Sequence, residues 1–394
     1  MARLSFVRVE GLTGRAASLM INFDEGLNVI WGSNGSGKTS LLKILHSAMT
    51  GDTAPLLRIS FTSAEVGFTT DLGRTIVRRI KRRVPHAPAL LEYPDGIEYE
   101  LYRDPDMAKY ELMEDARALR WDTLDGDIQE YLPHRYLPIS RIFDFRNRHG
   151  RPSRGGLSEV LDEVEYDRIF AEQIQSLWSE FHAQALSHTR AAQQDAINRI
   201  LGAALAGDEY IDPDERHQEV PIDDTRRLVQ TFFKANRGLS RHVNVKKVIS
   251  EFETDPLMNR VVRTVSAVQK QIEEALAPER RFAETLNALY SGTKFIDISG
   301  PRRLSVKLGH DDVQIPIESL ASGEKQVMRI LLETLVAGSS PVLVDEPEIS
   351  LHVDWQSRLL EMMRYINPRA QLIVASHSPE VVGSSWDRGL VIES

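Results

Sequence analysis

The spacing of apolar residues in the N-terminal segment predicts a strand, a turn, a second strand, a loop and a helix. The second strand is the short apolar run 27–31, and the segment 38–49 places Leu41, Ile44, Leu45 and Ala48 on one face of a helix. The connecting loop, residues 32–37, is rich in glycine. A strand, a glycine-rich loop and a helix in this order are typical of a nucleotide-binding domain.

Further patterns predict a second small sheet and a helical insertion. Residues 75–80 and 97–102 alternate as antiparallel strands do, and we interpret them as a β subdomain beside the nucleotide-binding sheet. Residues 157–206 have helical spacing, an acidic break with prolines follows at 207–224, and helical spacing resumes over 225–290 with breaks near Gly238 and Pro256. These segments predict an arm or lid, because they are too short and too irregular in heptads for a long coiled coil.

The C-terminal part predicts a parallel α/β core that both ends of the chain complete. A hairpin is expected over 304–317, then a helix at 324–336, a strand at 341–345, a helix at 354–365, and strands at 371–375 and 389–393. The predicted fold is therefore an α/β head with an antiparallel β subdomain and an inserted helical arm. Its expected divisions are 1–150 and 293–394 for the head and 151–292 for the insertion.

Composition narrows the classes of function. The chain has 394 residues, of which 42% are hydrophobic, so it can bury a sizeable core. It has no cysteine, which excludes disulfides and cysteine-ligated metals. The net charge of -9 argues against a protein that coats nucleic acid indiscriminately. No apolar run is long enough for a membrane span, so we expect a cytoplasmic protein.

Residues 32–39 fit the P-loop pattern G-x4-G-K-[ST], in which backbone N–H groups surround phosphate oxygens at a helix N-terminus. Lys38 is expected to neutralise the β- and γ-phosphates of ATP, and Thr39 to ligate Mg²⁺. A plain glycine-rich turn is the alternative, which the position between strand and helix disfavours. The expected ATP-binding residues are Gly32, Ser33, Asn34, Gly35, Ser36, Gly37, Lys38, Thr39 and Ser40.

Two carboxylates, Asp345 and Glu346, end the apolar strand 341–345, at the edge where α/β sheets hold ligands. Asp345 is expected to be the second protein partner of Mg²⁺. Glu346 is expected to be the general base that orients and deprotonates the attacking water. Alone, such a pair is as often a helix cap, and the P-loop in the same chain favours the catalytic interpretation.

Two weaker candidates lie nearby in the predicted core. Ser322, Gly323 and Glu324 precede an apolar helix, where Ser322 can cap the helix and direct its positive end at an anion; an ordinary N-cap is the alternative. His377 follows the strand 371–375 and is a candidate hydrogen-bond donor to a γ-phosphate. A lone histidine at a strand end is more often a surface residue.

Taken in order, these stretches resemble the ABC/SMC-type P-loop ATPases: Walker A GSNGSGKT, signature ASGEKQ, Walker B VLVDEPE and the switch histidine of ASHSPE. The resemblance implies hydrolysis of ATP to ADP and phosphate. It also implies that Ser322, Gly323 and Glu324 of one copy close on the γ-phosphate held by another. The chain would then act as a homodimer or higher homo-oligomer with composite sites.

The opening FVRVEGLTG...FDEGLNVIWGSNGSGKTSLL and the stretch DEPEISLHVDWQ look like the RecF and overcoming-lysogenization-defect (OLD) branch, often described as AAA ATPases. The segment between Thr39 and Ser322 is far longer than in a membrane-transporter ATPase subunit. Two departures stand out. No clear Q-loop glutamine is present near YLPISR at 136–141, and only 17 residues follow His377, too few for the Toprim nuclease of OLD proteins.

The resemblance leaves three hypotheses open. The leading one is an ATPase that controls a separate effector, a nuclease or toxin, in bacterial anti-phage defence, similar to the ATPase halves of the PARIS and Septu systems. The second is a RecF-like ATP-dependent DNA clamp used in repair, which would use the basic stretches 74–83 and 141–154. Both stretches are more simply interpreted as solvated edge and linker. The third is a scaffold that binds ATP without turnover.

Overall fold

The computed structural model describes residues 2–82, 119–124, 131–139, 163–206, 256–290, 294–298, 304–309, 313–383 and 389–392, together with a few isolated positions between 227 and 247. The chain divides into two compact units. The first is Met1–Ala171 with Pro316–Ser394, and the second is Glu172–Ile315. Among the described residues, no helix is long and apolar enough to cross a membrane.

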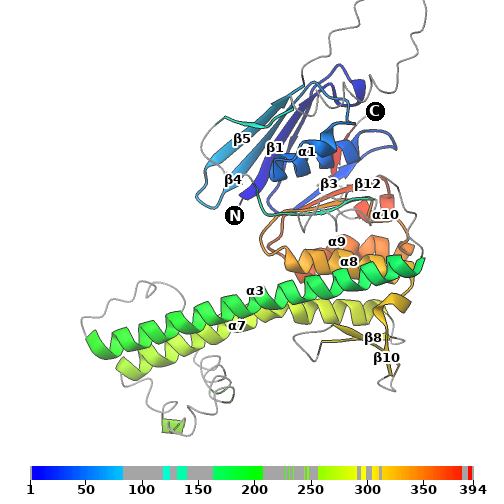
Figure 1. Ribbon diagram of the computed structural model, residues 1–394. Coiled ribbons are helices and arrows are strands. Elements are labelled where there is room, and N and C mark those ends of the chain that lie inside the picture. Colours follow the sequence, from blue (N-terminus) through cyan, green and yellow to red (C-terminus); the bar gives the residue numbers. More distant parts are fainter. Residues whose placement is uncertain are drawn as a thin grey trace, which may run out of the picture. The chain divides into compact units, whose positions relative to one another are not determined.

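A five-stranded parallel sheet organises the first unit (Figure 1). Its strand order is β13 (Gly389–Val391), β3 (Leu27–Trp31), β12 (Leu372–Ser376), β11 (Val342–Asp345) and β7 (Arg135–Leu137). Every neighbouring pair is parallel. All residues of β11 and β12 are buried, as expected for a parallel sheet that is covered on both faces.

An antiparallel sheet and helix α1 (Lys38–Thr50) cover one face of this parallel sheet (Figure 1). The antiparallel order is β2 (Leu19–Asn22), β1 (Ala2–Glu10), β4 (Ser63–Thr70), β5 (Thr75–Lys81) and β6 (Asp122–Thr123). Short 3-10 turns η1 (Leu12–Gly14) and η2 (Ala54–Leu56) follow β1 and α1. Helix α1 lies between the sheets, and the shared core includes Leu41, Ile44 and Leu45 of α1, Val66 and Phe68 of β4, and Leu343 and Ile373 of the parallel sheet.

The other face of the parallel sheet is covered by α8 (Ser322–Val336) and α9 (Val353–Ile366), which pack on each other. The turn η5 (Ile317–Ser319) leads into α8, and the short helix α10 (Pro379–Val382) packs on α9. Gly323 in the first turn of α8 approaches Ser350 in the loop after β11, and Gln356 in the first turn of α9 hydrogen-bonds to Glu348 after β11 and Ser378 after β12.

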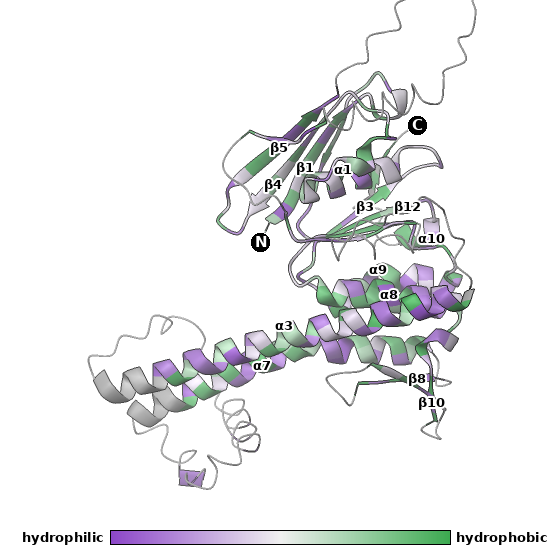
Figure 2. Ribbon diagram, viewed as in Figure 1, coloured by the Kyte–Doolittle hydropathy of each residue, from purple (hydrophilic) through white to green (hydrophobic). Residues whose placement is uncertain are grey.

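The second unit is built on two long helices. Helix α3 (Glu163–Ala206) begins in the first unit and continues in the second, and α7 (Pro256–Leu289) includes a proline at position 278. Trp178 of α3 and Phe282 of α7 pack with ring centroids 6.1 Å apart. The coloured parts of both helices carry mixed hydrophobic and hydrophilic residues (Figure 2). A three-stranded antiparallel sheet completes the unit: β10 (Val313–Ile315), β9 (Ser305–Leu308) and β8 (Lys294–Asp297).

The predicted order of elements is confirmed for the head, with three differences. The segment before residue 27 holds two paired strands, β1 and β2, where a single strand was predicted. The edge strand β7 was not predicted. The hairpin β9–β10 belongs to the second unit, where Ile296 donates its N–H to Asn287 of α7 and Leu304 exchanges hydrogen bonds with Gln175 of α3. The predicted segments 97–102 and 207–224 lie outside the described residues.

Candidate functional site

The P-loop connects β3 to α1, and its glycines allow the chain to turn tightly there. Gly37 has φ 92°, and a Cβ at this position would lie 3.2 Å from the side chain of Thr13 in η1. Lys38 is 4% exposed, and its ammonium donates to the carbonyls of Gly32 at 2.7 Å and Ser33 at 3.0 Å. Ser33, Asn34 and Gly35 are exposed, Ser36 is buried, and Ser40 is half-buried. The loop therefore presents backbone N–H groups and one cation, as a phosphate site requires.

The side chains of Thr39 and Asp345, the two residues expected to bind a metal, are in contact at the start of α1. The Thr39 hydroxyl donates to Asp345 Oδ1 at 3.2 Å. Asp345 is 3% exposed, and its Oδ2 has no hydrogen-bond partner among the described residues. Burial first, and then the charge of Glu346, raise the pKa of Asp345 to about 6, while the Thr39 hydrogen bond opposes the rise.

This donor set fits Mg²⁺. The cation prefers oxygen ligands and commonly takes only one or two from the protein, with the rest from phosphates and water. Within the described parts of the chain, no three His, Asp or Glu side chains form a larger metal cage. A divalent cation next to Asp345 would also favour its ionised form over the protonated one.

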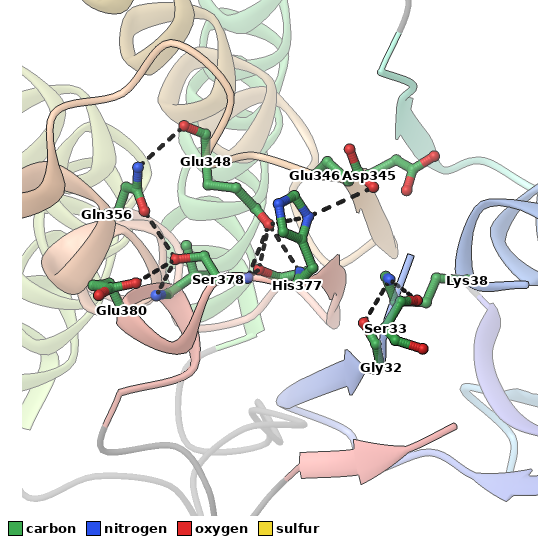
Figure 3. A network of polar contacts seen from close by, with 12 residues as sticks. Gly32, Ser33, Lys38, Asp345, Glu346, Glu348, Gln356, His377, Ser378 and Glu380 are labelled. Carbon is green, nitrogen blue, oxygen red and sulfur yellow. Dashed lines mark hydrogen bonds and ion pairs between the residues drawn. The ribbon is translucent and has the colours of Figure 1, made fainter. Parts of the chain in front are cut away.

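Glu346 follows Asp345 with a left-handed backbone, φ 46°, which is uncommon for a residue with a side chain. Its N–H donates to the carbonyl of Ala375 at 2.8 Å, so the turn is held on β12. Its carboxylate is 19% exposed, and Oε1 lies 3.7 Å from Nδ1 of His377. The geometry brings the expected base and the expected switch histidine together at the carboxyl ends of adjacent strands (Figure 3).

Two residues near this centre were not among the predicted site residues. Glu348 contacts His377, with Oε1 3.1 Å from Nδ1. The guanidinium of Arg15 donates to the P-loop carbonyl of Ser36 at 3.0 Å. The third acid of DEPE and an arginine in the opening LTGRAAS were the available signals, but neither position reveals its three-dimensional neighbours.

The signature residues begin α8, but Ser322 is not the N-cap. Ala321 holds that position, and the Glu324 carboxylate accepts from the Ala321 N–H at 2.7 Å. The predicted cap by Ser322 is therefore wrong, because Ser322 is already the first residue of the helix and does not hold the flanking position from which a side chain caps it. Ser322 is exposed, and its hydroxyl makes no hydrogen bond with any described residue.

Gly323 packs directly on the loop after β11: a Cβ at this position would lie 2.7 Å from the carbonyl oxygen of Ser350. A cavity of about 480 Å³ opens beside the signature. Lys325 in its wall forms a 2.5 Å ion pair with Asp167 in the first turns of α3. Neither Ser322 nor Gly323 makes a hydrogen bond or ion pair with the described P-loop of the same chain.

The basic stretch 74–83 is largely occupied within the head. Arg78 is 4% exposed and donates to the carbonyl of Ala48, Arg79 pairs with Glu65, and Arg82 donates to the carbonyls of Leu57 and Ile59. Arg74 and Lys81 are exposed. The second basic stretch, 141–154, and most of the segment searched for a Q-loop glutamine lie outside the described residues.

These features define a P-loop ATPase head of the ABC/SMC type. The parallel sheet carries a P-loop after β3, paired acids after β11 and a histidine after β12, and an antiparallel subdomain flanks it. The family described as "AAA domain, putative AbiEii toxin, Type IV TA system" matches residues 27–383, and the chain belongs to this family.

Two curated relatives extend the comparison. The chain is 19% identical over 392 residues to the "Retron Vc95 probable ATPase" of Vibrio cholerae serotype O1 biovar El Tor, covering 91% of this chain and 67% of the relative. It is 39% identical over 41 residues to the "Septu protein PtuA" of Bacillus thuringiensis, 10% of each chain. It thus spans about two-thirds of the first relative and a small part of the second.

Solved structures that align with the chain include an Smc head domain from Pyrococcus furiosus with an extended coiled coil, bound to the C-terminal domain of ScpA. It has 14% identity and a TM-score of 0.41, over 97% of this chain and 91% of that one. The SMC head domain from Thermotoga maritima aligns with 12% identity and a TM-score of 0.39, over 99% and 93% of the two chains.

Proposed function

We propose that this chain binds ATP with Mg²⁺ and hydrolyses it to ADP and phosphate. The contact between the Thr39 hydroxyl and the Asp345 carboxylate is the observation that supports this most directly. It joins the two oxygen ligands that a Mg²⁺ ion needs from the protein at the start of the phosphate-binding helix. Bound there, the cation would neutralise charge on the β- and γ-phosphates.

The protein's own groups have separate roles in this proposal. Lys38 binds the phosphates as a buried cation, and Glu346 orients the water that attacks the γ-phosphorus and accepts its proton as the bond to the β-phosphate oxygen breaks. His377 contacts the γ-phosphate through the ring nitrogen that does not face the carboxylates. Retention of both Asp345 and Glu346 is the reason to prefer an ATPase over a scaffold that binds ATP without turnover.

Two substitutions test this assignment. We expect Lys38→Ala to abolish ATP binding, and Glu346→Gln to leave binding intact while turnover falls at least about a hundredfold, because only the proton acceptor is lost. Glu361→Gln, on the exposed side of α9, is the matched control and should keep full turnover. Normal turnover in Glu346→Gln would contradict the assignment of the base.

We further propose that hydrolysis takes place in a homodimer, with Ser322 and Gly323 of one copy closing on the γ-phosphate held by the other. The exposed hydroxyl of Ser322 is available for such a contact. Ser322→Arg is expected to block ATP-dependent dimerisation, measured by size-exclusion chromatography with light scattering. Unchanged dimerisation of that variant in ATP would exclude this interface.

The biological role we propose is control of a separate effector, a nuclease or toxin, in bacterial anti-phage defence. The family description includes a toxin of a toxin–antitoxin system, and two relatives are named as a retron ATPase and a Septu protein. In this role, closing and opening of the ATP-bound dimer would hold or release the effector.

Tagged Glu346→Gln protein, purified from its native host with ATP and Mg²⁺, tests the role. A stoichiometric protein partner with nuclease or toxin features, absent from Lys38→Ala preparations, is the expected result. Salt-sensitive, ATP-dependent DNA binding without a protein partner would instead favour a RecF-like clamp. The internal partners of Arg78, Arg79 and Arg82 do not favour that outcome.

A further inference from the structure

Glu348 lies two residues after the proposed base, yet its environment is different. Its side chain is 5% exposed, against 19% for Glu346. One oxygen, Oε1, accepts hydrogen bonds from the Ser376 hydroxyl at 2.8 Å, the His377 N–H at 2.9 Å and the Ser378 N–H at 3.1 Å. The carboxylate therefore holds the last residue of β12 and the first two residues of the loop that follows it, which carries the switch histidine.

The same oxygen also contacts the imidazole ring of His377, at 3.1 Å from Nδ1, whereas the corresponding oxygen of Glu346 is 3.7 Å away (Figure 3). An Nδ1–H that donates to a carboxylate fixes the tautomer and the ring orientation, and leaves Nε2 facing outward. Backbone and ring of His377 are thus both held by a single atom of Glu348.

Gln356 of α9 supports this arrangement from the opposite side. Its amide donates to the carbonyls of Glu348 at 3.3 Å and Leu351 at 3.0 Å, and its Oε1 accepts from the Ser378 hydroxyl at 2.9 Å. The loop after β11 and the loop after β12 are therefore joined twice, once through Glu348 and once through Gln356 (Figure 3).

Joining two loops through a buried carboxylate is unfavourable in free energy, because removing a charge from water destabilises the folded state unless the charge is well paired. Glu348 Oε2 is buried with no partner among the described residues, so the group is not optimised for stability. An uncharged side chain could accept the same backbone hydrogen bonds. The charge strengthens all of these hydrogen bonds, but among the groups that face Glu348 Oε1 only the His377 ring has a second nitrogen that can contact a phosphate.

We propose that Glu348 is a positioning residue of the ATPase site, which orients His377 so that its Nε2 meets the γ-phosphate. This inference rests on the proposed hydrolysis of ATP and deepens it. Glu348 does not touch the nucleotide; it acts through His377. The two glutamates of DEPE then have different roles: Glu346 orients the attacking water, and Glu348 orients the histidine.

Glu348→Gln is the main test, because it removes the charge and keeps the shape and an acceptor oxygen. We expect kcat for ATP hydrolysis to fall about tenfold to a hundredfold, with KM changed less than about threefold because the P-loop is untouched. Glu380→Gln is the matched control. It neutralises an exposed carboxylate that lies 2.9 Å from the Ser378 hydroxyl in the same loop, without contact to the His377 ring, and it should keep kcat. An unchanged kcat in Glu348→Gln would overturn the proposal.

A double variant separates action through His377 from an independent role. Glu348→Gln added to His377→Ala is expected to lower kcat by less than about twofold beyond His377→Ala alone. A further tenfold loss would overturn the proposal, because Glu348 would then act on something other than the histidine.

A measurement without nucleotide keeps this inference distinct from the proposed function. In ¹⁵N-histidine-labelled protein, the His377 signals, assigned by their loss in His377→Ala, should report a protonated Nδ1 in the wild type and a changed Nδ1 shift in Glu348→Gln but not in Glu380→Gln. If the wild type hydrolyses no ATP while these shifts behave as expected, the proposed function fails and the contact stands. If it hydrolyses ATP and Glu348→Gln leaves the shifts unchanged, the positioning role fails.

Discussion

Among single residues, Asp345 is the clearest case in which the proposed function opposes stability. The ionised carboxylate that would bind Mg²⁺ is unfavourable in its buried position. Its ordinary pKa is 3.8, and burial raises it to about 6 in the folded protein. The folded state therefore holds the proton more tightly than the unfolded chain does. The stability contributed by this bound proton is fully present below about pH 4 and is lost as pH rises through about 6, a change on the order of 3 kcal/mol.

We expect Asp345→Asn to increase the free energy of unfolding of the nucleotide-free protein at pH 8 and to change it little at pH 4. The amide is uncharged at both values and can still accept from Thr39. Urea denaturation at the two pH values measures the difference. Asp122→Asn, which changes an exposed side chain of β6, is the control and should behave alike at both. A destabilised Asp345→Asn at pH 8 would show that burial of the charge is not the dominant effect.

At the scale of elements, the loop between β11 and α9 connects the parts of the site. It carries two left-handed residues, Glu346 at φ 46° and Ser350 at φ 66°. Such conformations are unfavourable and persist only where the surroundings hold them. Here the loop is held by the Ala375 carbonyl, by Gln356 and by the close approach of Gly323. The position of α8 is therefore tied to the loop that carries the proposed base.

Gly323→Ala tests this packing. A methyl group 2.7 Å from the Ser350 carbonyl has no room, so we expect a loss of about 1–3 kcal/mol in stability. Gly26→Ala is the matched control, because a Cβ there meets nothing within 4 Å. Thermal unfolding of both variants measures the effect. Equal melting temperatures for the two would mean that α8 can move away from the loop without penalty.

The elements of the head could be predicted from the sequence because their signals are local. Apolar periodicity predicted α1, β3, β11 and β12, and the P-loop pattern predicted the residues around Lys38. The rest depends on contacts between distant segments. The edge strand β7 has only three residues, and it is defined by pairing with β11. The roles of Glu348 and Arg15 likewise depend on partners far along the chain.

For the whole molecule, the main question is whether the signature acts on the P-loop of its own chain or on that of a second copy. Each chain carries both, yet the side chain of Ser322 is exposed at the start of α8, and its hydroxyl makes no hydrogen bond with a described residue of the same chain. If signatures act between chains, a dimer contains two composite sites, and each site takes its P-loop from one copy and its signature from the other.

Mixing two inactive variants tests this arrangement. In a heterodimer of Lys38→Ala and Ser322→Ala chains, one composite site combines both defects, while the other combines an intact P-loop with an intact signature. A mixture at equal amounts, with free exchange between dimers and independent sites, should therefore recover about a quarter of wild-type turnover, because half of the dimers are mixed and half of their sites are intact. Each variant alone, at the same total concentration, is the control. Turnover no higher than the mean of the two separate variants would mean that the signature acts on its own chain, since no mixed dimer could then restore a site.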